Sequence, residues 1–393
     1  MANKNKGYTF RKFIRDIHLW LGVGSGLILF LVCLSGTVYT FRHEIEEAVE
    51  PAKYRIENPE GNKVAAQQII DATQQKTKGK VGRISMYDDA AKPYELQVSM
   101  SEEDKRGETY YVDPFKNEIL GTGKGPTTEF FMTFFKLHRW LLFDEEIGRP
   151  IVGIATLIFV VLTITGLFLW LPKKIKGMKS FKPGLLIKFS ANWKRINHDL
   201  HNVLGLYTFI IILIMALTGL NWSFEWYKDG MSNVFGAKVF GGRDEKKMTS
   251  TVIEGANAIS IDSLIAIGNH TFAYQGKTII SLPKDAEGSF ELRKQNSENF
   301  NRESADKITV DQYSGAILKK ELYAAKTLGQ KIASQIKVIH IGEIFGTFSK
   351  VIYFISCLIA TSLPITGVII WINKLRKPKK KLVVATANAN KTL

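Results

Sequence analysis

Four histidines stand beside the apolar segments of this sequence, and they form two matched pairs. His18 and His201 each open an apolar run, "HLWLGVGSGLILFLVCLSG" and "HNVLGLYTFIIILIMALTG". His138 and His340 each precede an apolar run that ends in "TGLFLW" or "TGVIIW". An ionisable residue at membrane depth is costly, so it indicates a function. Paired imidazoles in an internal repeat are typical of haem iron held by two axial ligands.

The two runs that open with histidine also share a glycine four residues further on, Gly22 and Gly205. Residues at this spacing lie on the same face of a helix. A missing side chain there leaves room either for the plane of a porphyrin or for a closely packed neighbouring helix. The sequence alone favours neither reading.

Three further side chains are candidates to contact the same cofactor: His198, Arg15 and Arg139. His198 lies three residues before His201, so it is an alternative iron ligand. Its repeat counterpart is Arg15, which favours a contact with a haem propionate instead. Arginine suits bidentate binding of carboxylates, although ordinary anchoring at a membrane flank is an equally simple role for both arginines.

Four apolar segments of about 20 residues predict four transmembrane helices. Basic residues gather in residues 1–17, in the connector 173–197, which carries no acidic residue, and beyond residue 372. The positive-inside rule therefore places both termini and the connector in the cytoplasm. The net charge of +16 reflects this topology and contact with the lipid bilayer, so we expect no nucleic-acid partner.

The chain reads as two copies of one unit, in which a span, an outer segment and a second span follow each other. Both outer segments show a helical pattern, then alternating strand patterns, then a hairpin with the turn "DPFKN" or "DQYSG". We expect an N-terminus (1–17), a first span (18–41), an outer domain (42–137), a histidine segment with the second span (138–171), a connector (172–197), a third span (198–222), a second outer domain (223–339), a histidine segment with the fourth span (340–372) and a tail (373–393). The predicted fold is an α-helical four-span bundle with two α+β domains.

With these features the sequence resembles the PepSY-associated transmembrane helix family of bacterial inner-membrane proteins. The resemblance rests on "RDIHLWLG", "LHRWLL", "NHDLHNVLG", "IHIGEIFG" and the "TG" near three span ends, and it runs from Arg11 to about Lys374. Members of this family include proteins similar to ferric-siderophore reductases with two b-type haems. The resemblance therefore implies two haem b groups and PepSY-like domains in the periplasm.

The topology places His18 and His201 at the cytoplasmic face, and His138 and His340 at the periplasmic face. We expect each pair to bind one haem iron, so that electrons cross the bilayer to a periplasmic ferric siderophore or other ferric chelate. The segments on the cytoplasmic side are too short for a flavin domain, so the donor is a reduced flavin, a quinol or a separate protein. Two alternatives stay open: a PepSY membrane protein that binds or regulates without catalysis, and a haem protein that serves another periplasmic acceptor.

Overall fold

The computed structural model describes residues 8–101, 103–104, 107–240, 248–299, 301 and 304–376. The first seven residues of the predicted N-terminus and residues 377–393 of the predicted tail lie outside this range. Four helices are long and apolar enough to span a membrane, so this is a multi-pass membrane protein. They are α1 (Phe10–Tyr39), α6 (Glu145–Trp170), the continuous helix Trp193–Ser223 and α14 (Thr347–Leu375).

The third of these helices is divided by a change in its winding. It consists of α8 (Trp193–Asp199), a single π-helical stretch η2 (Leu200–Leu204) and α9 (Gly205–Ser223). A π turn widens the helix and changes the direction of the side chains that it carries, and such turns are frequent at functional sites. Here the widened turn carries His201.

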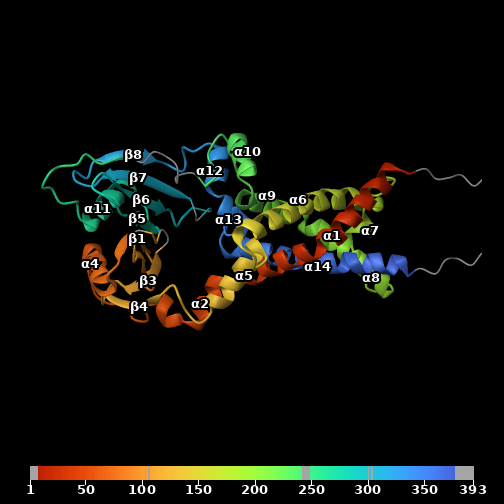
Figure 1. Cartoon of the computed structure of the whole chain (residues 1–393), viewed down its shortest axis with the longest axis horizontal. Helices are drawn as coiled ribbons and strands as arrows, with labels where there is room; N and C mark the ends of the chain where they lie inside the picture. The colour runs from red at the N-terminus through yellow and green to blue at the C-terminus, as the bar shows by residue number, and fades with distance from the viewer. Residues whose placement is uncertain are drawn as a thin grey trace, which may run out of the picture.

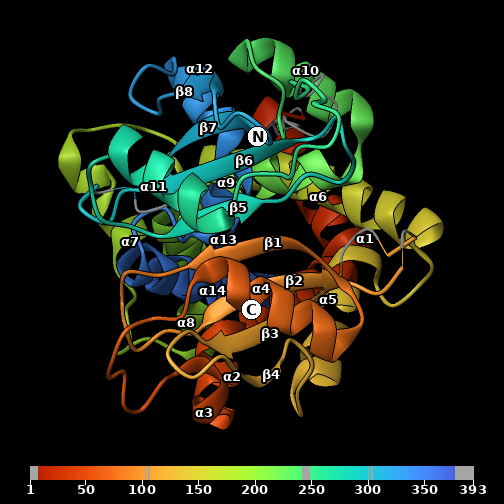
Figure 2. The same ribbon diagram turned by 90° about the vertical axis from the view of Figure 1, so that its left-hand side faces the viewer.

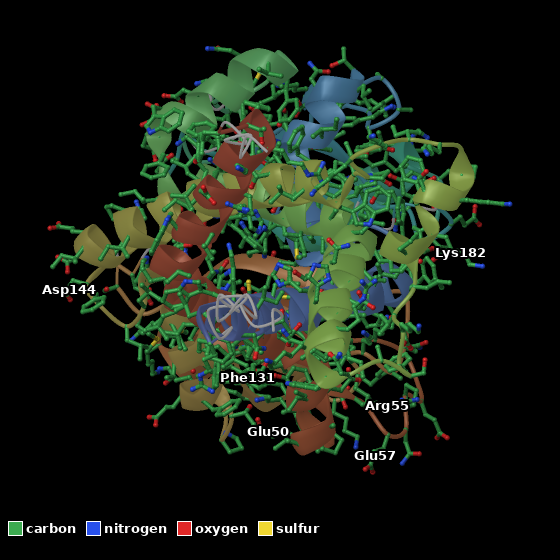
Figure 3. The ribbon with its side chains drawn as sticks, turned by 90° about the vertical axis from the view of Figure 1, so that its right-hand side faces the viewer. Glu50, Arg55, Glu57, Phe131, Asp144 and Lys182 are labelled. Atoms are coloured by element: carbon green, nitrogen blue, oxygen red, sulfur yellow. The ribbon has the colours of Figure 1, made fainter. Side chains whose placement is uncertain are left out.

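The four long helices form a closed ring in which α1 packs against α6 and α14, and α9 packs against the same two helices. Small residues allow the close approach, because Gly26 faces Pro364 of α14 and Gly153 faces Phe224, the residue that follows α9. Viewed end-on from the side on which α1 begins, the helices surround a common axis, with Lys182 and Asp144 on opposite flanks (Figure 3).

Short helices cap the end of the bundle that faces the sheet. They are α2 (Arg42–Val49), α3 (Pro51–Tyr54), α5 (Thr128–Trp140), α10 (Glu225–Phe235), α12 (Leu328–Ser334) and α13 (Ile336–Ile341). Helix α5 packs against α1 and α6, and α13 packs against α9. The opposite end carries the connector with η1 (Met178–Ser180) and α7 (Lys182–Leu185), and α1 begins and α14 ends there (Figure 1).

Each outer segment folds as one helix followed by four strands, which confirms the predicted α+β composition. The first contains α4 (Ala66–Thr77), β1 (Lys80–Met86), β2 (Tyr94–Ser99), β3 (Glu108–Asp113) and β4 (Glu118–Thr122). The second contains α11 (Ile261–Thr271), β5 (Thr278–Ser281), β6 (Ser289–Gln295), β7 (Ala305–Asp311) and β8 (Ile317–Glu321). Both predicted hairpin turns form where expected, because Asp113 and Asp311 each accept backbone N–H bonds from the residues of their turn.

The sequence did not predict that the two segments share one sheet. Their strands join in the order β4-β3-β2-β1-β5-β6-β7-β8, and all neighbours are antiparallel. The central pairing places Ile84 opposite Ile280, and α4 and α11 cover the same face of the sheet (Figure 2). The residues on that face form one joint apolar core. The pairing of β1 with β5 removes the two exposed edges that separate sheets would have there.

The two helices on the sheet also cap each other across the repeat. The Asp262 carboxylate accepts hydrogen bonds from the N–H groups of Ala66 (2.8 Å) and Gln67 (3.1 Å) at the start of α4. The Gln67 Oε1 atom accepts one from the N–H of Ile261 at the start of α11 (3.1 Å). Since these N–H groups have no partner within their own helices, the exchange ties the two outer segments together.

Candidate functional site

The structure brings His18 and His201 together in the half of the bundle that is remote from the sheet. Their ring centroids lie 6.4 Å apart, and the two ring planes stand at 89°. Each ring reaches the neighbouring long helix, because His18 Nδ1 lies 2.9 Å from Thr165 Oγ1 and His201 Nδ1 lies 2.9 Å from Thr366 Oγ1. We call these two histidines the inner pair.

His138 and His340, the outer pair, meet in the half of the bundle nearest the sheet. Their ring centroids lie 6.2 Å apart with planes at 52°. His138 Nδ1 lies 2.8 Å from the carbonyl oxygen of Val32, and His340 Nδ1 lies 3.0 Å from both Thr218 Oγ1 and the carbonyl oxygen of Met215. Along α1, the contact at Val32 is about 21 Å from His18, given a rise of about 1.5 Å per residue. The pairs are therefore separated along the membrane normal.

The hydrogen bonds determine which nitrogen of each ring carries the proton. A carbonyl oxygen can only accept, so His138 and His340 donate from Nδ1. The hydroxyls of Thr165 and Thr366 donate their single proton to carbonyl oxygens of their own helices, so they accept from His18 and His201. All four rings thus carry hydrogen on Nδ1, and Nε2 keeps a lone pair for a metal.

Each ring also packs against a glycine that lies next to its hydrogen-bonding residue or one turn beyond it. A Cβ atom added at this glycine would lie 3.1–3.4 Å from the Cε1 atom of the imidazole. The pairs are His18 with Gly166, His201 with Gly367, His138 with Gly36 and His340 with Gly219. These are the glycines near the ends of the four spans, and each follows a serine or threonine. Each histidine ring therefore packs against a Ser-Gly or Thr-Gly dipeptide of a neighbouring helix. A larger residue at these positions would displace the ring.

The separation of the rings suits one metal ion between each pair. With a bond of about 2 Å from a metal to each imidazole nitrogen, two ring centroids stand about 6 Å apart. Among the described residues, no group of three His, Cys, Asp or Glu side chains is placed to hold a metal. Two imidazoles alone do not complete a tetrahedral zinc site, but they do complete a haem iron whose porphyrin supplies four nitrogens. The donor set therefore fits haem.

The outer pair is neutral and lies among apolar and aromatic groups. Burial lowers the pKa of His138 and that of His340, the latter to about 4, and the proximity of the two rings lowers the pKa of His340 further. Trp222 lies against His340, with ring centroids 5.2 Å apart. Two buried polar atoms nearby in the chain, Trp140 Nε1 and Asn221 Oδ1, have no hydrogen-bond partner among the described residues.

The other predicted site residues lie around the inner pair or beside the outer one. The His198 side chain is 55% exposed and points its Nδ1 atom to Asp199 (3.6 Å), so His201 is the residue that faces His18. Arg15 pairs with Asp16 (2.7 Å), and Arg139 lies over the rings of Phe135 and Trp140. A propionate contact by Arg15 or Arg139 stays a prediction.

Gly22 and Gly205 have only ordinary contacts around them. A Cβ atom there would lie 3.7 Å from Leu162 and 3.8 Å from Leu363. The contact of the "TG" dipeptides with the histidines was not predicted from the sequence, where these dipeptides are features of the family resemblance. The signal in the sequence was that a Ser-Gly or Thr-Gly dipeptide recurs near the end of all four spans, at matching distances from the histidines.

Comparison with protein-family models gives one match, described as PepSY-associated TM region, over residues 15–374. The match includes both histidine pairs, nearly all of the four long helices and the complete sheet. No curated protein matches the chain.

Proposed function

Because this chain belongs to the PepSY-associated TM region family, we propose that it is an inner-membrane oxidoreductase that binds two haem b groups. In this proposal it passes electrons from a cytoplasmic donor to a periplasmic acceptor, with a ferric siderophore as the favoured substrate. The observation that carries the proposal is that two imidazole pairs lie at two depths of one bundle. The ring centroids are 6.4 Å apart within the inner pair and 6.2 Å apart within the outer pair.

The residues of the chain would perform two tasks. The Nε2 atoms of the inner and outer pairs would bind iron, while Thr165, Thr366 and the carbonyl oxygens of Val32 and Met215 hold the opposite ring nitrogens. Haem, when bound, supplies one-electron redox chemistry. Each histidine pair would hold one haem, and a haem held by two histidines would supply electron transfer rather than oxygen binding.

The overall reaction balances with a separate donor. A reduced flavin or a quinol loses two electrons and two protons, and two ferric ions each gain one electron. Ferrous iron is less strongly bound by hard oxygen donors than ferric iron, so reduction weakens the chelate and releases the metal. The basic connector, which includes α7, lies at the donor side and is the surface that a soluble anionic donor or the inner leaflet would contact.

An absorption spectrum of the detergent-purified chain, before and after dithionite, tests the proposal. We expect sharp reduced α and Soret bands and about two haem b groups per chain in a pyridine haemochrome assay. A colourless protein, expressed with ample haem, would instead support a PepSY membrane protein without catalysis. Reduced spectra without oxidation by any ferric chelate would favour a different periplasmic acceptor.

A further inference from the structure

The joint sheet has two chemically different faces. Alternating residues such as Ile84, Leu96, Ile280, Leu292 and Ile308 point into the core under α4 and α11. Their neighbours point to the opposite face because successive side chains of a strand alternate. The central residues of that opposite face are Arg83, Glu95, Ser281, Glu291, Arg293 and Lys307.

This polar face looks toward the bundle. Figure 1 shows α4 and α11 on the side of the sheet remote from the bundle, while α5 and α13 lie at the bundle end nearest the sheet. At the edge of the sheet, Tyr111 of β3 contacts Tyr54 of α3, with ring centroids 4.8 Å apart. Helix α3 thus covers only the margin, and Arg83 and Arg293 on the central strands stay exposed. The polar face is thus turned toward the end of the bundle at which α5 and α13 carry the outer pair.

The charges of the polar face do not cancel. Glu95 pairs with Lys277 (3.7 Å), and Glu291 pairs with Lys307 (2.9 Å). Among the described residues, Arg83 and Arg293 form no ion pair, so they leave an excess of positive charge. Burial lowers the pKa of Lys326, and the nearby charges of Arg293 and Lys307 lower it as well, whereas those of Glu321 and Asp306 raise it.

The two arginines are close enough to act on one ligand. Arg83 lies opposite Ser281, which lies opposite Glu291, and Arg293 follows two residues later. Two strand spacings and two residues of rise put their Cα atoms about 12 Å apart. A guanidinium binds carboxylate and catecholate oxygens through a planar fork of N–H donors.

We propose that the face around Arg83 and Arg293 binds an anionic ferric chelate, one whose iron is held by carboxylate or catecholate oxygens. This inference rests on the proposed function and gives it a substrate class. The arginines hold the chelate between the sheet and the outer pair, where its Fe(III) gains one electron and becomes Fe(II). A cationic ferric hydroxamate gains nothing from this face.

The test compares two ferric chelates of opposite charge on the full-length, detergent-purified chain. Binding of the anionic ferric complex of citrate and of a cationic ferric trihydroxamate is measured by quenching of intrinsic tryptophan fluorescence. In R83Q/R293Q we expect the affinity for the citrate complex to fall by about tenfold or more, the loss of one to two charge-assisted contacts, with unchanged affinity for the hydroxamate. Wild-type binding of the citrate complex weakens with salt more steeply than that of the double variant.

A matched control variant loses two positive charges outside the polar face. Lys78→Gln and Lys116→Gln remove two exposed cations from the α4 end of the first outer segment and should leave both affinities unchanged. Equal affinity for the citrate complex in wild type and R83Q/R293Q overturns the inference, whatever the haem content. A colourless wild type that still loses citrate binding in R83Q/R293Q overturns the proposed reductase and keeps the anion-binding face.

Discussion

The Nδ1 atom of His201 lies 2.9 Å from Oγ1 of Thr366, whose own hydroxyl proton is donated to main-chain carbonyl oxygens of α14. The threonine therefore accepts from the ring and leaves Nε2 without hydrogen. A second bond of this kind raises the basicity of a metal-binding imidazole and fixes its orientation. Thr366 is thus a positioning residue for the inner pair.

Replacing Thr366 with valine keeps the shape of the side chain and removes the acceptor. We expect about tenfold or more weaker binding of the inner haem. We also expect a higher reduction potential of that haem, because a less basic ligand stabilises ferric iron less. Haem titration and a spectroelectrochemical titration measure the two effects, and Thr366→Ser should restore both.

Thr156 offers the matched control, because the same Thr→Val change can be made there. It lies in the long helix α6, and its hydroxyl bonds to the carbonyl oxygen of Val152 in the same helix (2.7 Å). Thr156→Val should leave haem affinity and potential unchanged. An equal shift in Thr156→Val and Thr366→Val would show that polarity within the bundle, not the bond to the ring, is responsible.

The glycines facing the rings make a steric prediction. A Cβ atom at Gly219 would lie 3.1 Å from His340 Cε1, so Gly219→Val forces this ring out of its position. We expect loss of the outer haem and retention of the inner one, seen as about half of the wild-type haem per chain. Gly24→Ala is the control, since no atom lies within 4 Å of its added Cβ. Loss of both haems in Gly219→Val would indicate general misfolding of the bundle.

Single histidine variants separate the two sites. His18→Ala or His201→Ala should remove the inner haem alone, and His138→Ala or His340→Ala the outer haem alone, because in the proposed function each pair binds one iron. His198→Ala should retain both, since that side chain is turned to Asp199. Haem counts and reduced spectra of the purified variants decide this. If His198→Ala lost a haem while His201→Ala kept both, the assignment of the inner ligand would be wrong.

The sequence predicted the architecture well because its signals are local or periodic. The lengths of the apolar runs predicted four spans, and the matched turns at Asp113 and Asp311 predicted equivalent outer segments. The repeat also paired His18 with His201 and His138 with His340, which the structure places ring to ring. Their iron-binding role is still a proposal.

Three features required the fold itself. The joint sheet depends on pairing between Ile84 and Ile280, which are almost 200 residues apart and carry no special sequence signal. The π turn that carries His201 interrupts a segment for which the sequence analysis predicted one regular span over residues 198–222. The contact of each ring with a glycine on another helix is visible only when the order of helices around the bundle is known.

Reciprocal capping by Asp262 and Gln67 makes the last prediction, which concerns the coupling of the outer segments. In Asp262→Ala, the N–H groups of Ala66 and Gln67 lose their acceptor, at a cost of about 1–2 kcal/mol. We expect faster hydrogen exchange at the start of α4, although the mutation lies in α11. Ser260→Ala is the matched control, because its hydroxyl accepts only from Ser263 within α11, so exchange should rise there and not in α4. Unchanged exchange in α4 of Asp262→Ala would show that pairing of β1 with β5 alone holds the two segments together.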